Sequence, residues 1–276
     1  MINLKVSTGI LGGIVVGSVV YSLTEPFRYI IKRYEIMHPN IPRAFDGYCI
    51  AFLADLHYGR TSKERFIGKI VRRVNQHNPD LILLGGDYIT HRKYIKPCFE
   101  QLGQLKARDG IYGVLGNHDV FESEPESLYH MRHAGIGYLG NKGQWITRGN
   151  QRIKIGGVGD LWTQTQDLSP TVADLEATDY SILVTHNPKY IYEIDENVQI
   201  GLALAGHTHG GQVKALKYLN KVTPNHINEK VGLEYLSGKY TSKNMDIIVS
   251  NGIGTAKIPF RFMTPPEVII ITLRCQ

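Results

Sequence analysis

Apolar runs and amphipathic stretches alternate along most of the chain, and this pattern predicts strands alternating with helices. Leu81–Leu84 and Ile111–Leu115 are continuous apolar runs, which are typical of strands buried on both faces. Further elements are predicted as strands at 48–54, 154–157, 182–185 and 202–205, and as helices at 63–76, 95–106 and 123–133. This order predicts an α/β fold built around one large core.

The N-terminal segment breaks this alternation. The stretch from Val6 to Leu23 contains eighteen residues without a charge, which is long enough to span a bilayer as a helix. We expect a membrane-anchor helix over residues 1–24, with a cleaved signal peptide as the alternative. Gly9, Gly13 and Gly17 share one helix face, so dimerisation through the anchor helix is a further expectation.

Residues 25–44 form a second distinct segment. Four apolar residues between Phe27 and Tyr34 follow the spacing of one helix face, and three basic residues take the other side. This pattern predicts a basic amphipathic helix that rests on an anionic membrane surface, followed by a linker. The cations on this side of the apolar segment place the remaining domain, residues 45–276, on the cytoplasmic side.

The charge balance supports an anionic partner. The chain has 31 basic and 25 acidic residues, a net charge of +6 and a pI of about 9.1. Lipid headgroups, a polyanionic substrate or nucleic acid would all satisfy this balance, and composition does not choose among them. The three cysteines are scattered and odd in number, which argues against a disulfide framework or a zinc ribbon.

Residues that commonly bind metals follow five of the apolar runs. They offer carboxylates, imidazoles and one amide without a thiolate, a set that divalent cations of borderline hardness accept. One such motif alone is weak evidence for a metal site, because a core histidine or a turn aspartate has the same appearance in a sequence. Five in order predict a centre for two metal ions in a metal-assisted hydrolase. The motifs are Asp55-x-His57, Gly86-Asp87, Gly116-Asn117-His118-Asp119, His186 and Gly206-His207-x-His209.

The spacing within these motifs suggests how the side chains converge. Side chains alternate along extended backbone, so we expect Asp55 and His57 to point the same way while Leu56 points into the core. His207 and His209 repeat this spacing. Ligands that follow strand ends agree with the rule that open α/β sheets bind at the carboxyl ends of their strands.

This ordered set resembles the calcineurin-like metallophosphoesterases, from about Phe45 to the C-terminus. The branch it is most similar to is that of the small bacterial YaeI/YkuE-type phosphodiesterases, related to UDP-2,3-diacylglucosamine pyrophosphatases. The similar stretches are FLADLHYGR (52–60), PDLILLGGDYI (79–89), GVGDLW (157–162), THNP (185–188), GHTHGGQ (206–212), and SNGIGT, PFRF and PPEV within 250–268. The resemblance implies a two-sheet sandwich flanked by helices and, with the anchor, a place at the bacterial inner (cytoplasmic) membrane.

The resemblance also implies roles for individual residues. One metal would be held by Asp55, His57 and His209, the other by Asn117, His186 and His207, with Asp87 bridging the two. His118 would donate to the phosphate or protonate the leaving oxygen, with Asp119 orienting it. Mn²⁺ is the expected cofactor, with Fe²⁺, Zn²⁺ and Mg²⁺ as alternatives.

Two further residues keep alternative interpretations. Arg60 could clamp a phosphate bidentately, and a solvated loop arginine explains it equally well. Asp160 in GVGDLW fits a residue that supports the substrate site, and it also fits a turn aspartate after a strand.

We therefore expect a dimetal phosphodiesterase or pyrophosphatase. The leading substrate candidate, from the resemblance, is UDP-2,3-diacylglucosamine of lipid A biosynthesis. The alternatives are a general membrane-anchored phosphodiesterase, a nuclease of the same fold and a metal-free interaction module. Nucleic acid is the less favoured partner, because no basic stripe interleaved with aromatic residues occurs outside 25–34. An interaction module need not retain every ligand.

Overall fold

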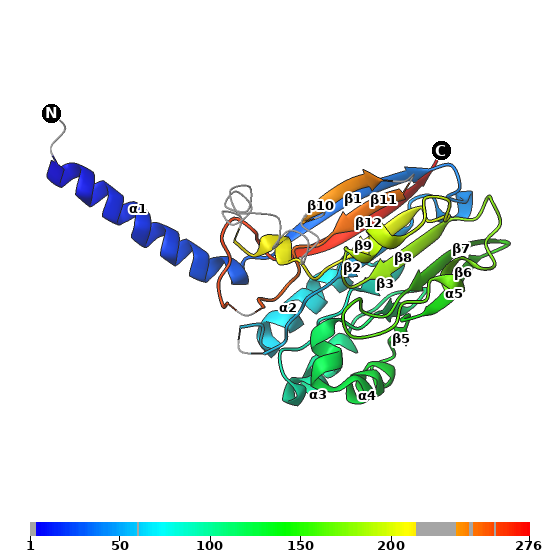
Figure 1. The fold of residues 1–276 in the computed structure, drawn as a ribbon, viewed down its shortest axis with the longest axis horizontal. Helices are drawn as coiled ribbons and strands as arrows, with labels where there is room; N and C mark the ends of the chain where they lie inside the picture. The colour runs from blue at the N-terminus through cyan, green and yellow to red at the C-terminus, as the bar shows by residue number, and fades with distance from the viewer. Residues whose placement is uncertain (1–3, 60, 214–235, 243–244, 257) are drawn as a thin grey trace.

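Two six-stranded sheets stack face to face within the part of the chain that the structure describes (Figure 1). The structure is a computed structural model that describes residues 4–59, 61–213, 236–242, 245–256 and 258–276, with side chains from residue 13 onward. The first sheet, in spatial order, consists of β1 (Ile30–His38), β12 (Glu267–Cys275), β2 (Cys49–Leu53), β3 (Leu81–Leu84), β4 (Ile111–Gly113) and β5 (Gly137–Tyr138). The second consists of β10 (Gly238–Ser242), β11 (Met245–Val249), β9 (Leu202–Ala205), β8 (Ser181–Thr185), β7 (Gln151–Gly157) and β6 (Lys142–Arg148).

Helices cover the outer faces of this sandwich. The first sheet is flanked by α2 (Glu64–Asn75), α3 (Ile95–Leu102) and α4 (Asn117–His133). The remaining helices are α1 (Leu4–Thr24), α5 (Ser169–Val172), α6 (Tyr190–Glu193) and the 3-10 turns η1 (Glu25–Phe27), η2 (Arg43–Phe45), η3 (Arg92–Tyr94) and η4 (His209–Gly211). The predicted two-sheet α/β architecture is confirmed.

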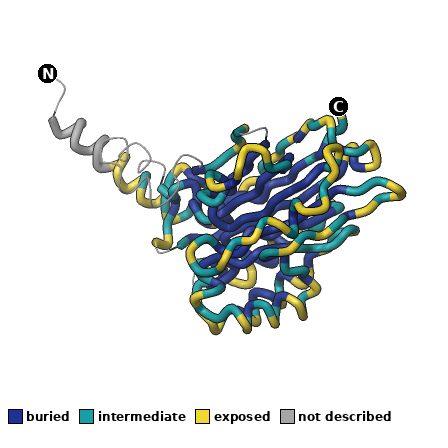
Figure 2. Tube along the Cα trace, turned by 45° about the vertical axis from the view of Figure 1, so that its right-hand side comes forward, coloured by how far each residue is buried: buried dark blue, intermediate teal, exposed yellow. Residues whose placement is uncertain are grey.

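The central strands explain why the sandwich forms. Because side chains alternate along a strand, Ile50 and Phe52 of β2 enter the core between the sheets, whereas Ala51 and Leu53 pack beneath the helices. Every residue of β3, β8 and β9 is buried, as the continuous apolar runs predict. Figure 2 shows this burial concentrated in the strands, with exposed residues on the outer loops and on the last turns of the N-terminal helix.

The predicted amphipathic helix between Phe27 and Tyr34 is wrong. This segment contains β1, which pairs in parallel with β12 from Ile30 opposite Glu267 to His38 opposite Cys275. β-Branched and aromatic residues suit a strand, and the apolar β12 gains a hydrogen-bonding neighbour on each side. One of the basic residues of this segment also pairs with the protein itself, since Lys32 Nζ lies 3.6 Å from the buried carboxylate of Glu267.

The N-terminal helix forms where the sequence predicts it, as α1, and extends away from the body (Figure 1). Among the residues that the structure describes, no helix is both long and apolar enough to cross a membrane. The prediction of a membrane-spanning anchor over residues 1–24 is therefore not supported. The last turn of α1 contacts the body instead, where the rings of Tyr21 and Phe262 meet edge to face at 5.6 Å.

Candidate metal centre

The predicted metal ligands lie in the loops and first helical residues that follow the carboxyl ends of the central strands of both sheets. Each loop begins within a few residues of its strand's end, so the strands fix where the polar side chains start. These loops carry Asp55 and His57 after β2, Asp87 after β3, Asn117 after β4, His186 after β8, and His207 and His209 after β9.

Left-handed backbone brings these side chains together. The φ angles are positive at five of the predicted ligands, namely Asp55 (52°), His57 (42°), Asp87 (54°), His207 (67°) and His209 (52°). The expectation that Asp55 and His57 converge by alternation along a strand is wrong, because β2 ends at Leu53. Such conformations are costly for residues with side chains and cluster at functional sites, where the surroundings hold them in place.

Hydrogen bonds between neighbouring loops supply this support. The amides of Asp55 and His57 donate to the carbonyl oxygens of Gly86 and Asp87, at 2.9 and 3.0 Å. Across the two sheets, the His207 amide donates to both carboxylate oxygens of Asp55, each at 3.0 Å. The motifs after β2, β3 and β9 therefore form one interlocked unit.

Two motif glycines leave room for the carboxylates. A Cβ at Gly116 would lie 2.3 Å from Oδ1 of Asp87, and a Cβ at Gly206 would lie 2.4 Å from Oδ2 of Asp55. Both distances are far below van der Waals contact. The two carboxylates can therefore take these positions only because residues 116 and 206 are glycine.

The predicted ligands gather into two adjoining sets, and His118 forms a third, overlapping group with His57 and Asp87. Ligand atoms of Asp55, His57 and His209 lie within 4.8 Å of one another, and so do those of Asp87, His186 and His207. Asp87 Oδ2 lies 3.4 Å from Nε2 of His57 and 3.4 Å from Nε2 of His186. Asp87 therefore lies between the sets, as the bridging role implied by the resemblance requires.

The donor atoms suit divalent cations. Nε2 of His57 faces Nε2 of His209 at 3.0 Å, and Nδ1 of His207 faces Nε2 of His186 at 3.1 Å. Two imidazole ligands on one cation are separated by about 3 Å, because metal–nitrogen bonds measure about 2.0–2.1 Å. Among the described residues, buried Oδ1 of Asn117 has no hydrogen-bond partner, so it is available as an oxygen ligand.

Burial keeps three of the imidazoles neutral, the form that a metal ligand needs. It lowers the pKa of His57 to about 4 and that of His207 to about 3, and it holds the pKa of His209 well below its usual value. Burial also opposes ionisation of Asp87, but the adjacent His186 outweighs it and holds the pKa of this carboxyl well below its usual range. Asp87 in turn raises the pKa of His186 to about 10 despite burial.

His118 lies at the mouth of this cluster in the first turn of α4. Its half-buried ring meets that of His57 edge to face at 4.8 Å, and its backbone amide donates to Asp87 Oδ1 at 2.9 Å. A histidine beside the ligand sets can reach a bound phosphoryl group or its leaving oxygen.

The structure gives Asp119 a different contact from the one implied by the resemblance. Its Oδ1 accepts the amide of Tyr88 at 2.8 Å, and its Oδ2 accepts that of Gly116 at 2.9 Å. Both oxygens are thus engaged by the backbone of two ligand loops, and neither is hydrogen-bonded to His118 within the described part of the chain. Arg60 lies outside the described residues.

Sequence reasoning assigned no role to Arg261, which is fully buried behind the centre. Its guanidinium donates to the carbonyl oxygens of Asn251 (2.8 Å) and Thr264 (2.9 Å), and one nitrogen lies 3.3 Å from Nδ1 of His209. The only sequence signal was its place in the PFRF stretch. Its link to His209 is long-range and leaves no local pattern.

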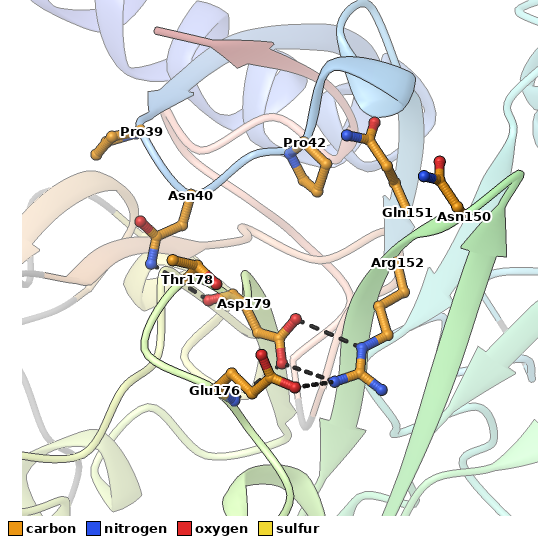
Figure 3. Close-up of a pocket in the computed structure, with 9 residues that line it drawn as sticks. All are labelled: Pro39, Asn40, Pro42, Asn150, Gln151, Arg152, Glu176, Thr178 and Asp179. Atoms are coloured by element: carbon orange, nitrogen blue, oxygen red, sulfur yellow. Dashed lines mark hydrogen bonds and ion pairs between the residues drawn. The ribbon is translucent and has the colours of Figure 1, made fainter.

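A cavity of about 590 Å³ lies away from these loops, beside the start of β7 (Figure 3). Its cation, Arg152, is already paired with Asp179 at 3.1 Å and with Glu176 at 3.5 Å. None of the predicted site residues that the structure describes lines it, so these residues give the cavity none of the proposed chemistry.

The chain is similar in sequence to several curated proteins. An uncharacterized metallophosphoesterase of Helicobacter pylori is 32% identical over 81% of this chain and 59% of its own length. The uncharacterized metallophosphoesterase YkuE of Bacillus subtilis is 28% identical over 91% of this chain and 87% of its own. This chain spans 59% and 63% of the first two curated relatives it matches.

Among solved structures, the chain is similar to NAD nucleotidase of Haemophilus influenzae, with a TM-score of 0.49 and 15% identity over 74% of this chain and 45% of the other. The sequence profile of the calcineurin-like phosphoesterases matches residues 49–211, and the chain belongs to this family.

Proposed function

We propose that the protein hydrolyses a phosphodiester or pyrophosphate at a centre for two divalent cations. The observation that carries the proposal is the position of Asp87, whose carboxylate lies 3.4 Å from a histidine of each ligand set. When bound, the two cations would polarise the phosphoryl group and lower the pKa of a water molecule towards neutrality. Mn²⁺ is the proposed ion, with Fe²⁺, Zn²⁺ and Mg²⁺ to be compared against it.

The protein's own groups have separate tasks in this proposal. Asp55, His57 and His209 would hold one cation, and Asn117, His186 and His207 the other. His118 is not required by either set, so its imidazole is free to donate a proton or a hydrogen bond to the leaving oxygen. The loops that hold the ligands are already locked together, so little reorganisation is needed on binding.

The direct test is metal content and activity of the Asp87→Ala variant. After chelation and reconstitution with Mn²⁺, wild type should bind two ions per chain and hydrolyse a nitrophenyl diester. Asp87→Ala should lose most activity and weaken both sites at once. Asp167→Ala, a change at an exposed turn, is the control and should behave as wild type. A wild-type rate in Asp87→Ala would contradict the proposal, and absence of cation binding in wild type would favour the metal-free interaction module.

A finer proposal concerns the natural substrate. We propose an amphiphilic phosphoester at the cytoplasmic face of the bacterial inner membrane, with UDP-2,3-diacylglucosamine as the leading candidate, in line with the resemblance to the YaeI/YkuE-type branch. Support comes from the net charge of +6 and from exposed apolar side chains on α1, among them Ile14 and Val16, which are 60% and 64% exposed. Such side chains would rest on a lipid surface.

Two measurements test this finer proposal. Wild type with Mn²⁺ should release UMP from the lipid nucleotide in detergent micelles, and the full chain should sediment with anionic vesicles. If wild type releases no UMP but still hydrolyses the nitrophenyl diester, the lipid-nucleotide proposal fails and the alternative of a general phosphodiesterase is favoured. Cleavage of a single-stranded oligonucleotide under the same conditions would favour the nuclease alternative.

A further inference from the structure

Trp162 exposes a large aromatic surface directly beside the candidate metal centre. It lies in the loop after β7, and 51% of the residue is exposed. Its ring meets that of His207, a predicted ligand, edge to face, with centroids 4.4 Å apart and planes at 87°. Because half of the residue is exposed, Trp162 offers aromatic surface to a ligand beside the predicted metal ligand His207.

The loop holds this ring in a defined place. Asp160 is fully buried, and its Oδ2 accepts the amides of Trp162 at 3.0 Å and Thr163 at 3.1 Å. These bonds are those of a turn aspartate, one of the two interpretations of Asp160, and its buried Oδ1 has no hydrogen-bond partner among the described residues. The Gln164 side chain closes the loop by accepting the Asp160 amide at 3.0 Å. The indole is therefore presented by an ordered turn.

The same loop is tied to the element that carries His118. Gln164 Nε2 donates to Glu124 of α4 at 2.6 Å. The first turn of that helix carries His118, the candidate for contact with the phosphate, and Phe121, which is 71% exposed. Trp162 is thus fixed relative to the predicted ligand His207 and to the part of α4 that follows the interruption at Ser123.

We propose that Trp162 determines specificity by stacking against a planar aromatic group attached to the phosphorus, such as a nucleobase or an aryl ester. This inference rests on the proposed phosphoesterase function and names the substrate feature that the same site selects. A phosphoryl group seated at the ligand sets places its substituent within reach of the adjacent indole face. Aliphatic substituents would gain less there, because they lack a flat π-face.

Kinetics on two diesters with the same leaving group test the proposal. Bis(nitrophenyl) phosphate and methyl nitrophenyl phosphate both release nitrophenol and differ in the group that remains. Trp162→Ala should raise KM for the diaryl ester about 5- to 100-fold, the range expected for loss of one stacked ring, with a much smaller change for the methyl ester. Trp162→Phe should retain most of the preference, and kcat and metal content should stay near wild type.

The second tryptophan supplies a matched control and a binding assay. Trp145 in β6 is engaged away from the centre, where its indole N–H donates to Asp174 at 2.8 Å and the Arg152 guanidinium lies over its ring at 3.8 Å. Trp145→Phe should leave both KM values unchanged. Because the chain has two tryptophans, this variant also makes Trp162 the sole indole reporter. Its fluorescence should be quenched by UMP and much less by ribose 5-phosphate.

The outcomes separate this inference from the proposed function. Equal rises in KM for both diesters, or loss of bound metal in both Trp162 variants, would assign Trp162 a structural role and overturn the inference. Equal quenching by UMP and ribose 5-phosphate, or none by either, would also overturn it. If wild type hydrolyses neither diester, the proposed function fails, and the fluorescence titration still decides whether Trp162 binds a planar ring.

Discussion

Asp119→Ala should destabilise the fold by an amount that its two backbone contacts define. The carboxylate is fully buried and accepts the amides of Tyr88 and Gly116, which belong to two different ligand loops. Removing it leaves two buried N–H groups without an acceptor, at about 1–3 kcal/mol each, so the free energy of unfolding should fall by about 2–6 kcal/mol. Burial and the charge of Asp87 raise the pKa of Asp119 to about 8, so ionisation of this carboxyl is unfavourable in the folded protein. The substitution removes this unfavourable contribution as well, so the net loss of stability should lie towards the lower end of that range.

Urea unfolding of the metal-free chain measures this loss, and metal content measured separately reports on the loops. Asp167→Ala is the control, because Asp167 accepts one amide, that of Ser169 at 2.9 Å, at an exposed turn. Its effect should be well below that of Asp119→Ala. An Asp119→Ala chain as stable as wild type but strongly impaired in rate would refute this reasoning and restore the role of orienting His118.

Three other changes probe the centre and the sheet. Gly206→Ala should lose bound metal, because its Cβ would meet the Asp55 carboxylate at 2.4 Å. Gly17→Ala, whose Cβ would meet no described atom within 4 Å, should keep its metal, and inductively coupled plasma analysis of the two variants measures the difference. His118→Ala should keep both metals and lose about 10²–10⁴-fold in rate, less for good leaving groups, and loss of metal would instead identify His118 as a ligand. A chain without residues 1–36 should fail to fold to a cooperative state by circular dichroism, because it lacks most of β1; cooperative unfolding would contradict this.

The sequence predicted best what is encoded locally. Runs such as Leu81–Leu84 are too short for helices and too apolar for an exposed edge, so they identify buried strands. Each motif comes directly after such a run in the chain, so its place at the end of a strand is also predicted locally. The helix predicted over 123–133 is present as the part of α4 that follows the non-helical residue Ser123, whereas the helical turn from Asn117 up to Ser123 was not predicted.

Long-range pairing decided the features that the sequence did not predict. The apolar residues from Phe27 to Tyr34 satisfy helical spacing and also suit a strand, and only the presence of β12, far along the chain, selects β1. The left-handed backbone at Asp55 and His57 depends likewise on carbonyl groups of the next loop, at Gly86 and Asp87. Neither partner lies within the window that a local pattern covers.

Arg261 shows how such long-range contacts reach the centre from the N-terminal helix. Its backbone amide donates to the carbonyl oxygen of Ser22 at 3.1 Å, in the last turn of α1, while its side chain lies 3.3 Å from Nδ1 of His209. Burial lowers the pKa of Arg261 to about 10, so the guanidinium remains charged at neutral pH and needs its carbonyl acceptors. These acceptors include Gly254, whose amide in turn donates to the carbonyl oxygen of Asp55 at 2.7 Å. One buried cation therefore ties the end of α1, the segment after β11 and a ligand of each sheet into a single structural unit.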